Sequence, residues 1–293
     1  MLSFDGIWVP LVTPFAQGEV DHPALRRLVR HLAAQGVAGF MPCGSTGEAA
    51  MLDEAEQDAV LATVLAAAAD KPVLMGLAGT RPERVAARAQ RLAAQHAVAG
   101  WLVTAPAYVK PSQAAIGDYF HTVASATPLP LVAYDVPART GVRIQPATLL
   151  ALADHPQIKA VKDCSADRAA AEIVLADGRL ALLAGNDDEI FDQLARGAAG
   201  AIAASAHLTT GSFVALHRLM QAGALAQARA LWRRLHALTT AAFAEPNPAP
   251  VKAALARQGW LRNELRAPMW PAGEATATAL LEAVAAAQPV NRQ

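Results

Sequence analysis

The chain has 293 residues, and its 25 basic and 25 acidic side chains give a formal net charge of zero. Without a basic stripe or a long run of like charges, nucleic acid and anionic membrane surfaces are poor candidate partners. Two cysteines make no disulfide framework, and the first residues lack a secretory signal pattern. We therefore expect a soluble cytoplasmic enzyme that acts on small molecules.

Eight short apolar runs recur along the chain, each followed by a helical pattern. The runs are continuous rather than alternating, which is typical of parallel strands covered on both faces. The expected strands are residues 6–11, 37–43, 72–77, 100–103, 129–134, 158–162, 180–183 and 200–204.

The helices between the runs begin at capping side chains or early prolines. These starts are Asp21, Asp53 with Glu56 in a capping-box pattern, Arg81-Pro82, Ser112 and Pro146. Further helices are expected over residues 186–195 and 210–219.

Eight successive βα units predict the α/β class, with either a closed barrel or an open doubly wound sheet. An open sheet commonly carries a Gly-rich fingerprint after its first strand, and the segment 10–14 has none. We predict a (β/α)8 TIM barrel over residues 1–224. A helical C-terminal extension over residues 225–293 should follow, broken near residues 245–250 and Pro268.

In such a barrel the active site lies at the carboxyl ends of the strands. Lys162 ends the apolar run 158–162. A desolvated lysine has a lowered pKa, and its neutral amine attacks carbonyls to form a Schiff base. The alternative is a lysine that extends from a strand end into water.

The segment 44–48, Gly-Ser-Thr-Gly-Glu, follows the second apolar run. Ser45 and Glu48 have capping-box spacing, but Asp53 and Glu56 offer a better cap. Glycines on both sides of two hydroxyls let backbone N–H groups converge on an anion, and we favour a carboxylate-binding loop built on Ser45 and Thr46.

Tyr134 ends another buried run, where it is either a core tyrosine or the proton shuttle that a Schiff-base lysine needs. Arg139 follows a proline-stiffened turn and forms either a rim salt bridge or a fork for a second carboxylate. The scattered histidines suggest no metal site. Cys43 and Cys164 are interpreted as buried thiols.

Taken together, segment 44–48, segment 134–141, Lys162-Asp163 and Gly185 resemble the dihydrodipicolinate synthase/N-acetylneuraminate lyase family of pyruvate-dependent class I aldolases. The resemblance covers essentially the whole chain. It implies that Lys162 forms a Schiff base with pyruvate, with no other cofactor, and that Tyr134 shuttles protons. It also implies the roles of the remaining site residues: Ser45 and Thr46 bind the pyruvate carboxylate and link the tyrosines, Tyr108 reaches across a dimer interface, Gly185 shapes the pocket wall, and Ile202 contacts pyruvate.

Segment 136–141 resembles the synthase branch, in which the arginine, here Arg139, binds the carboxylate of L-aspartate semialdehyde. The resemblance therefore implies synthesis of 4-hydroxy-tetrahydrodipicolinate in lysine (diaminopimelate) biosynthesis, by a homotetramer built from dimers. Three departures are Ser45 in place of threonine, Asp135 in place of asparagine, and Ala107 before Tyr108 in place of a tyrosine pair. They leave two alternatives open: a pyruvate aldolase or dehydratase for a 2-keto-3-deoxy sugar acid or hydroxy-keto acid, and a keto-acid-binding barrel without turnover.

The resemblance also bears on regulation by lysine. In lysine-inhibited synthases the feedback site uses polar and aromatic side chains. The corresponding positions here are Ala49, Glu54, Gln57, Thr80, Arg84 and Ala107. Because Arg84 would repel the cationic ligand, we predict weak or absent inhibition by lysine.

Overall fold

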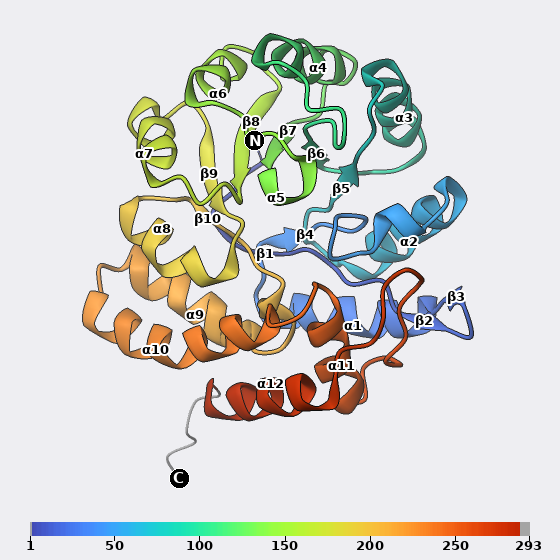
Figure 1. Cartoon of the computed structure of the whole chain (residues 1–293), viewed down its shortest axis with the longest axis vertical. Coiled ribbons are helices and arrows are strands. Elements are labelled where there is room, and N and C mark those ends of the chain that lie inside the picture. The colour runs from blue at the N-terminus through green and yellow to red at the C-terminus, as the bar shows by residue number, and fades with distance from the viewer. Residues whose placement is uncertain (1, 288–293) are drawn as a thin grey trace. The chain divides into compact units, whose positions relative to one another are not determined.

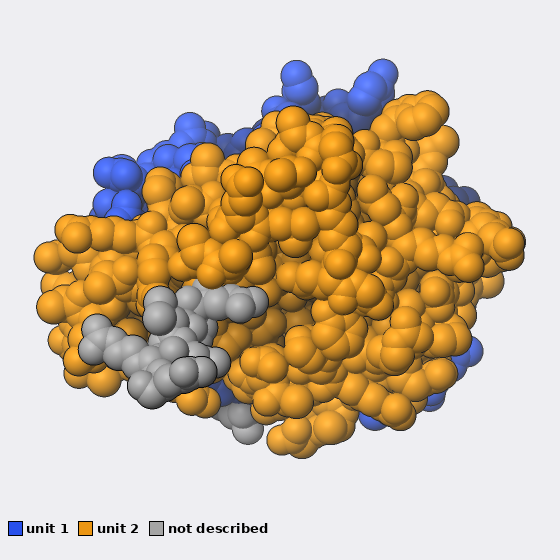
Figure 2. Space-filling view, turned by 90° about the horizontal axis from the view of Figure 1, so that it is seen from below, with its two compact units in different colours: residues 1–5, 72–202 blue, residues 6–71, 203–293 orange. Residues whose placement is uncertain are grey.

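The structure, a computed structural model, describes residues 2–287 (Figure 1). The chain divides into two compact units. Unit 1 comprises residues 1–5 and 72–202, and unit 2 comprises residues 6–71 and 203–293 (Figure 2).

Unit 1 holds six parallel strands that are neighbours in chain order. They are β5 (Leu74–Leu77), β6 (Gly100–Thr104), β7 (Leu131–Asp135), β8 (Ile158–Asp163), β9 (Ala181–Ala184) and β10 (Gly200–Ile202). Its helices are α3 (Pro82–Gln95), α4 (Gln113–Ser125), α5 (Pro137–Thr140), α6 (Pro146–Leu152), α7 (Arg168–Asp177) and α8 (Ile190–Arg196). The strands are buried almost throughout, as their continuous apolar runs predict.

Unit 2 holds the parallel pair β1 (Gly6–Val9) and β4 (Gly39–Phe40) and the antiparallel pair β2 (Phe15–Ala16) and β3 (Glu19–Val20). Its helices are α1 (His22–Ala34), α2 (Glu54–Ala67), α9 (Thr210–Gln221), α10 (Leu225–Ala242), α11 (Ala249–Arg257) and α12 (Glu274–Ala287). Within this unit, α10 packs against α9 and α12.

The predicted helix starts are confirmed because capping is a local interaction. The Asp53 carboxylate accepts from the N–H of Glu56 at 2.8 Å, and the Glu56 carboxylate accepts from the N–H of Asp53 at 3.0 Å. Asp21 and Ser112 also cap their helices, and α3 and α6 begin with proline.

All eight predicted strands are present and alternate with helices, so the fold is the predicted (β/α)8 barrel of the α/β class. The helices α10, α11 and α12 leave breaks at 243–248 and 258–273, where the prolines predicted them. The domain boundary between residues 224 and 225 stays a prediction. No helix within residues 2–287 is long and apolar enough to cross a membrane.

The sequence patterns missed three elements. The β2–β3 hairpin consists of two-residue strands around Gln17 and Gly18, whose φ angles are 57° and 84°. Two positive φ angles suit the tight turn of a hairpin, but strands this short show no periodicity. The four-residue α5 was also not predicted, and the helix expected after the sixth run, α7, was not located.

Candidate active site

The ends of β7 and β8 bring Tyr134 and Lys162 together. The strand register pairs Tyr134 directly with Lys162, and both side chains are 5% exposed. The Lys162 Nζ lies 4.3 Å from the centroid of the Tyr134 ring. A buried amine thus lies against the ring of a buried tyrosine, and a side-chain hydrogen bond with Tyr134 also acts on the Lys162 pKa.

The pKa of Lys162 departs from the prediction. Burial lowers this pKa, but Tyr134, Cys164 and Asp187 raise it, and the net direction is upward from the usual lysine value. The expected desolvation is present, yet the neighbouring acidic groups outweigh it. A lysine whose pKa is raised must lose a proton before it can attack a carbonyl.

Gly185 follows β9 at a point where no side chain fits. Its N–H donates to the Asp163 carbonyl at 2.8 Å. An added Cβ would lie 2.4 Å from the Cys164 Sγ and 2.7 Å from the Asp163 carbonyl oxygen. Glycine at this position therefore lets the end of β9 approach the segment that follows Lys162 closely.

Cys164 and Asp187 also act on Lys162 at the end of β8. The Cys164 Sγ lies 3.9 Å from the Tyr134 hydroxyl, and burial raises the pKa of this thiol to about 11. Cys164 is consequently a neutral thiol at pH 7 rather than a competing nucleophile. Asp187 is 3% exposed and acts on the pKa of Lys162 as an anion.

Ile202 ends β10 and is 1% exposed. The register pairs Ala201 with Ala184, and Ala184 with Asp163. The residues paired across β8, β9 and β10 are therefore Asp163, Ala184 and Ala201, and Ile202 lies one position further along β10. Its strand is two strands away from β8, which carries Lys162.

The loop after β7 carries Arg139 on the exposed surface of α5. Gly141 ends this helix with a φ of 76°, and an added Cβ would lie 2.9 Å from the Lys110 Cε. The Thr140 hydroxyl donates to the Val142 carbonyl at 2.8 Å. These contacts hold the turn that presents Arg139 to solvent.

Asp135 anchors the other end of this loop. Its carboxylate accepts from the N–H of Ile144 at 3.1 Å, and the side chain is 2% exposed. Burial raises the pKa of Asp135 to about 7, the Ile144 N–H opposes the rise, and Asp163 adds to it. A carboxyl group that titrates near neutrality thus lies directly beside Tyr134 in the chain.

Tyr108 follows β6 and is 94% exposed, with a φ of 72°. This side chain is not brought into the buried cluster of its own chain. An exposed tyrosine on strained backbone is consistent with a residue that meets another molecule, as the family resemblance implies.

Ser45 and Thr46 belong to unit 2, where Thr46 is 4% exposed and Ser45 is half-buried. The Asn247 amide donates to the Thr46 hydroxyl at 2.9 Å. The carbonyl of Gly47 accepts from the Thr13 hydroxyl at 2.7 Å, and an added Cβ at Gly47 would lie 2.9 Å from the Leu11 carbonyl oxygen. The loop therefore packs closely against residues 11–13, which follow β1, and against the segment that contains Asn247.

Glu48, at the end of the same loop, is not a capping residue. It adopts a left-handed conformation with a φ of 56°, and its carboxylate forms a fully buried ion pair with Lys252 at 2.6 Å. Its other oxygen accepts from the N–H of Arg266 at 3.2 Å. This ion pair fixes the loop that carries Ser45 and Thr46.

Sequence reasoning missed Asp187, Asn247 and Lys252 as parts of these sites. Asp187 was visible as a polar residue after the seventh run, but nothing marked it as a charge partner of Lys162. Asn247 and Lys252 lie some two hundred residues from the groups they contact, and no local pattern predicts such pairs. The described residues contain no cluster of histidine, cysteine and carboxylate side chains that could hold a metal ion.

Comparison with known proteins agrees with this geometry. Residues 3–287 match the model of the dihydrodipicolinate synthetase family. The 4-hydroxy-tetrahydrodipicolinate synthase of Sorangium cellulosum is 39% identical over 97% of this chain and 96% of its own.

Two solved structures are similar over almost the whole fold. The dihydrodipicolinate synthase of Thermotoga maritima is 31% identical, with a TM-score of 0.93 over 97% of this chain and 98% of that chain. A monomeric dihydrodipicolinate synthase variant is 30% identical, with a TM-score of 0.93 over 97% of both chains. The protein therefore belongs to the dihydrodipicolinate synthetase family.

Proposed function

We propose that this protein is a Schiff-base-forming class I lyase that condenses pyruvate with L-aspartate semialdehyde to give 4-hydroxy-tetrahydrodipicolinate, a step of lysine biosynthesis. Family membership and the names of its relatives support the reaction. The observation that carries the proposal is the buried contact between Lys162 and Tyr134. A site that only bound a keto acid would not need a nucleophile beside a proton carrier.

In this proposal the reaction begins with proton transfer from the Lys162 ammonium, with Tyr134 as the adjacent carrier. The neutral amine attacks the C2 carbonyl of pyruvate, and the resulting carbinolamine loses water to give an imine. Loss of a proton from C3 gives an enamine, which attacks the aldehyde carbon and regenerates the imine. The amino group of the semialdehyde then attacks the imine carbon and expels the Lys162 amine, which closes the ring and frees the enzyme. Each of these steps moves a proton, which explains the need for a phenol in contact with the amine.

The other site residues bind and position the substrates. Ser45 and Thr46 bind the pyruvate carboxylate, supported by the glycine-flanked loop and the Asn247 contact that orients the Thr46 hydroxyl. Arg139 binds the carboxylate of the aldehyde, which its exposed position on α5 allows.

The close packing at Gly185 and the buried Ile202 shape the pyruvate pocket. This scheme needs no cofactor, because the covalent bond to pyruvate is formed by Lys162 itself.

We further propose that the protein assembles as a homotetramer of dimers in which Tyr108 contributes to the neighbouring subunit's site. The exposed Tyr108 supports a role between subunits, whereas one structural relative is a monomeric variant. The cytoplasmic location stays a prediction from the sequence.

Trapping the imine tests the covalent step. The protein is incubated with pyruvate and sodium borohydride and weighed by mass spectrometry, and the reduced adduct should map to Lys162. Unmodified mass in a folded protein would contradict the proposal and favour a binding protein.

Turnover identifies the aldehyde. L-Aspartate semialdehyde should be consumed with pyruvate, while a panel of 2-keto-3-deoxy sugar acids should not be cleaved. The opposite preference would assign the protein to another pyruvate aldolase activity and contradict the proposed substrate.

A further inference from the structure

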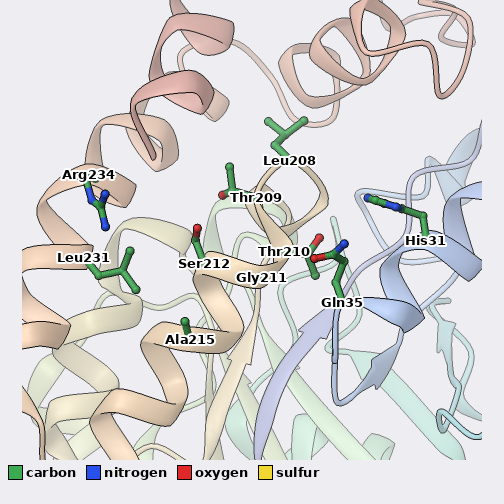
Figure 3. Close-up of a pocket in the computed structure, with 10 residues that line it drawn as sticks. All are labelled: His31, Gln35, Leu208, Thr209, Thr210, Gly211, Ser212, Ala215, Leu231 and Arg234. Atoms are coloured by element: carbon green, nitrogen blue, oxygen red, sulfur yellow. The ribbon is translucent and has the colours of Figure 1, made fainter. Parts of the chain in front are cut away.

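A cavity lies entirely within unit 2, and its lining includes none of the residues described above around Lys162. It has a volume of about 600 Å³. Its walls come from α1, from the start of α9 and from α10 (Figure 3). The lining residues are His31, Gln35, Leu208, Thr209, Thr210, Gly211, Ser212, Ala215, Leu231 and Arg234.

The start of α9 leaves hydrogen-bonding groups unused at this cavity. Thr209 is the N-cap residue, but its side chain makes no capping hydrogen bond. Within the described chain the backbone N–H groups of Thr210 and Gly211 have no hydrogen-bond acceptor, whereas Ser212 and Phe213 donate to the Thr209 carbonyl. An open helix start of this kind attracts anions, because its free N–H groups carry a partial positive charge.

Thr209 provides an independent observation. Its side chain is 8% exposed, and its hydroxyl oxygen has no hydrogen-bond partner among the described residues. In Figure 3 this oxygen points toward the side of the cavity where Ser212 and Arg234 lie. A buried hydroxyl without a partner is unfavourable, and a ligand in the cavity would supply one.

Arg234 is the one charged side chain among the ten lining residues, because burial lowers the pKa of His31 below its usual value. Arg234 extends from α10 on one side and His31 from α1 on the other (Figure 3). None of the ten lining residues is acidic. A guanidinium, a hydroxyl and free backbone N–H groups together form a donor set that suits a carboxylate or a phosphate.

Apolar side chains complete the cavity, with Leu208, Ala215 and Leu231 beside the polar groups. A cavity of about 600 Å³ has the usual size of a small-molecule site. We propose that this cavity, hereafter the α9 pocket, is a second binding site for a small organic anion. The carboxylate or phosphate head binds at the start of α9 with Arg234 and Thr209, and the apolar body packs on Leu208, Ala215 and Leu231.

Calorimetric titration with phenyl phosphate and with benzoate tests the α9 pocket, with benzyl alcohol as the uncharged probe of similar size. Titrations are carried out on the full chain carrying Lys162→Ala, so that covalent chemistry at the first site is absent. Either anion should bind one equivalent at this pocket, and benzyl alcohol should bind roughly tenfold more weakly or not at all. Equal affinity for all three probes, or no binding of either anion, would overturn the proposal.

Matched variants locate the bound anion. Arg234→Glu should weaken binding by at least about tenfold through lost attraction and added repulsion. Arg233→Glu makes the same charge change on the same helix at a residue outside the pocket, and should leave affinity unchanged. Equal loss in both variants, or no loss in Arg234→Glu, would contradict the site.

Thr209→Val separates a binding role from a structural one. Because the Thr209 hydroxyl has no partner in the protein, its removal should not lower the melting temperature of the ligand-free protein. The same change should weaken the anion roughly threefold to tenfold. A lower melting temperature with unchanged affinity would overturn the role given to this hydroxyl.

Discussion

Two of the five lysines are buried, and they occupy opposite kinds of environment. Lys252 is 0% exposed and donates to the Glu48 carboxylate at 2.6 Å and to the Thr13 carbonyl at 2.9 Å. Lys162 is 5% exposed and faces the ring of Tyr134. Asp187 acts on the Lys162 pKa as an anion.

The pKa directions also differ between the two amines. Burial lowers the pKa of Lys252 despite the attraction of Glu48, whereas Tyr134, Cys164 and Asp187 raise that of Lys162. Burial and pKa direction alone would therefore select Lys252 rather than Lys162, the nucleophile that we propose. What distinguishes Lys162 is its partners, since a phenol can exchange protons with it while an ion pair with two strong acceptors holds Lys252 in place.

Replacing each lysine in turn should give the largest difference between the two environments. Lys162→Ala should abolish the borohydride-trapped adduct and lower turnover by roughly a thousandfold or more, because no other amine reaches the keto acid. Lys252→Ala, if folded, should still form the adduct. Adduct formation in Lys162→Ala, measured by mass spectrometry, would contradict the assignment.

Lys252 should instead matter for stability. Lys252→Met leaves the Glu48 carboxylate buried without its cation, at a cost of about 3–5 kcal/mol in the free energy of unfolding. Urea unfolding measures this loss. The double variant Glu48→Gln/Lys252→Met should recover much of it, and Lys71→Met serves as the less buried control. A loss no larger than that of the control would show that the ion pair is dispensable.

Asp135, beside Tyr134, should give unit 1 a pH-dependent stability. Its folded pKa of about 7 lies above the usual value of 3.8, so the native state binds the proton more tightly than the unfolded state. Stability should therefore fall as pH rises from about 4 through 7, and Asp135→Asn should be more stable than the parent by about 2–4 kcal/mol at pH 8.

The two proteins should differ least at about pH 3, below the usual carboxyl pKa of 3.8, because Asp135 is then mostly protonated in both the folded and the unfolded parent. Urea unfolding at both pH values checks this, with the exposed Asp118→Asn as control. A difference between the variant and the parent that does not change with pH would contradict the raised pKa.

Replacing Arg139 should affect the pyruvate and aldehyde half-reactions differently. Arg139→Ala should leave formation of the pyruvate adduct unchanged and raise the KM for the aldehyde by roughly 10- to 100-fold, because a bidentate carboxylate contact is lost. Steady-state kinetics with each substrate varied in turn measures the split. An equal loss in both half-reactions would refute the role.

Free L-lysine, added as an inhibitor, should have the smallest effect on turnover. With Arg84 and the alanines at 49 and 107 in the positions of the feedback site, a lysine titration should not inhibit turnover at sub-millimolar concentration. Strong inhibition in that range would show that other residues form the regulatory site.

The sequence by itself determined the eight strands and most of the helices between them, and it predicted that Lys162 and Tyr134, which the structure places in contact, lie at one site. These features are readable because apolar runs, caps and prolines act within a few residues, and because Lys162 and Tyr134 each end a buried run. Short elements such as the β2–β3 hairpin and α5 could not be predicted, because they span too few residues to show a periodic pattern.

Tertiary structure alone decided what surrounds those residues. It paired Glu48 with Lys252 and Thr46 with Asn247 across about two hundred residues of chain. It also placed Tyr134 and Asp187 so that the pKa of Lys162 rises instead of falling. A pKa is the balance of desolvation against nearby charges, and those charges come from segments that only the folded chain brings together.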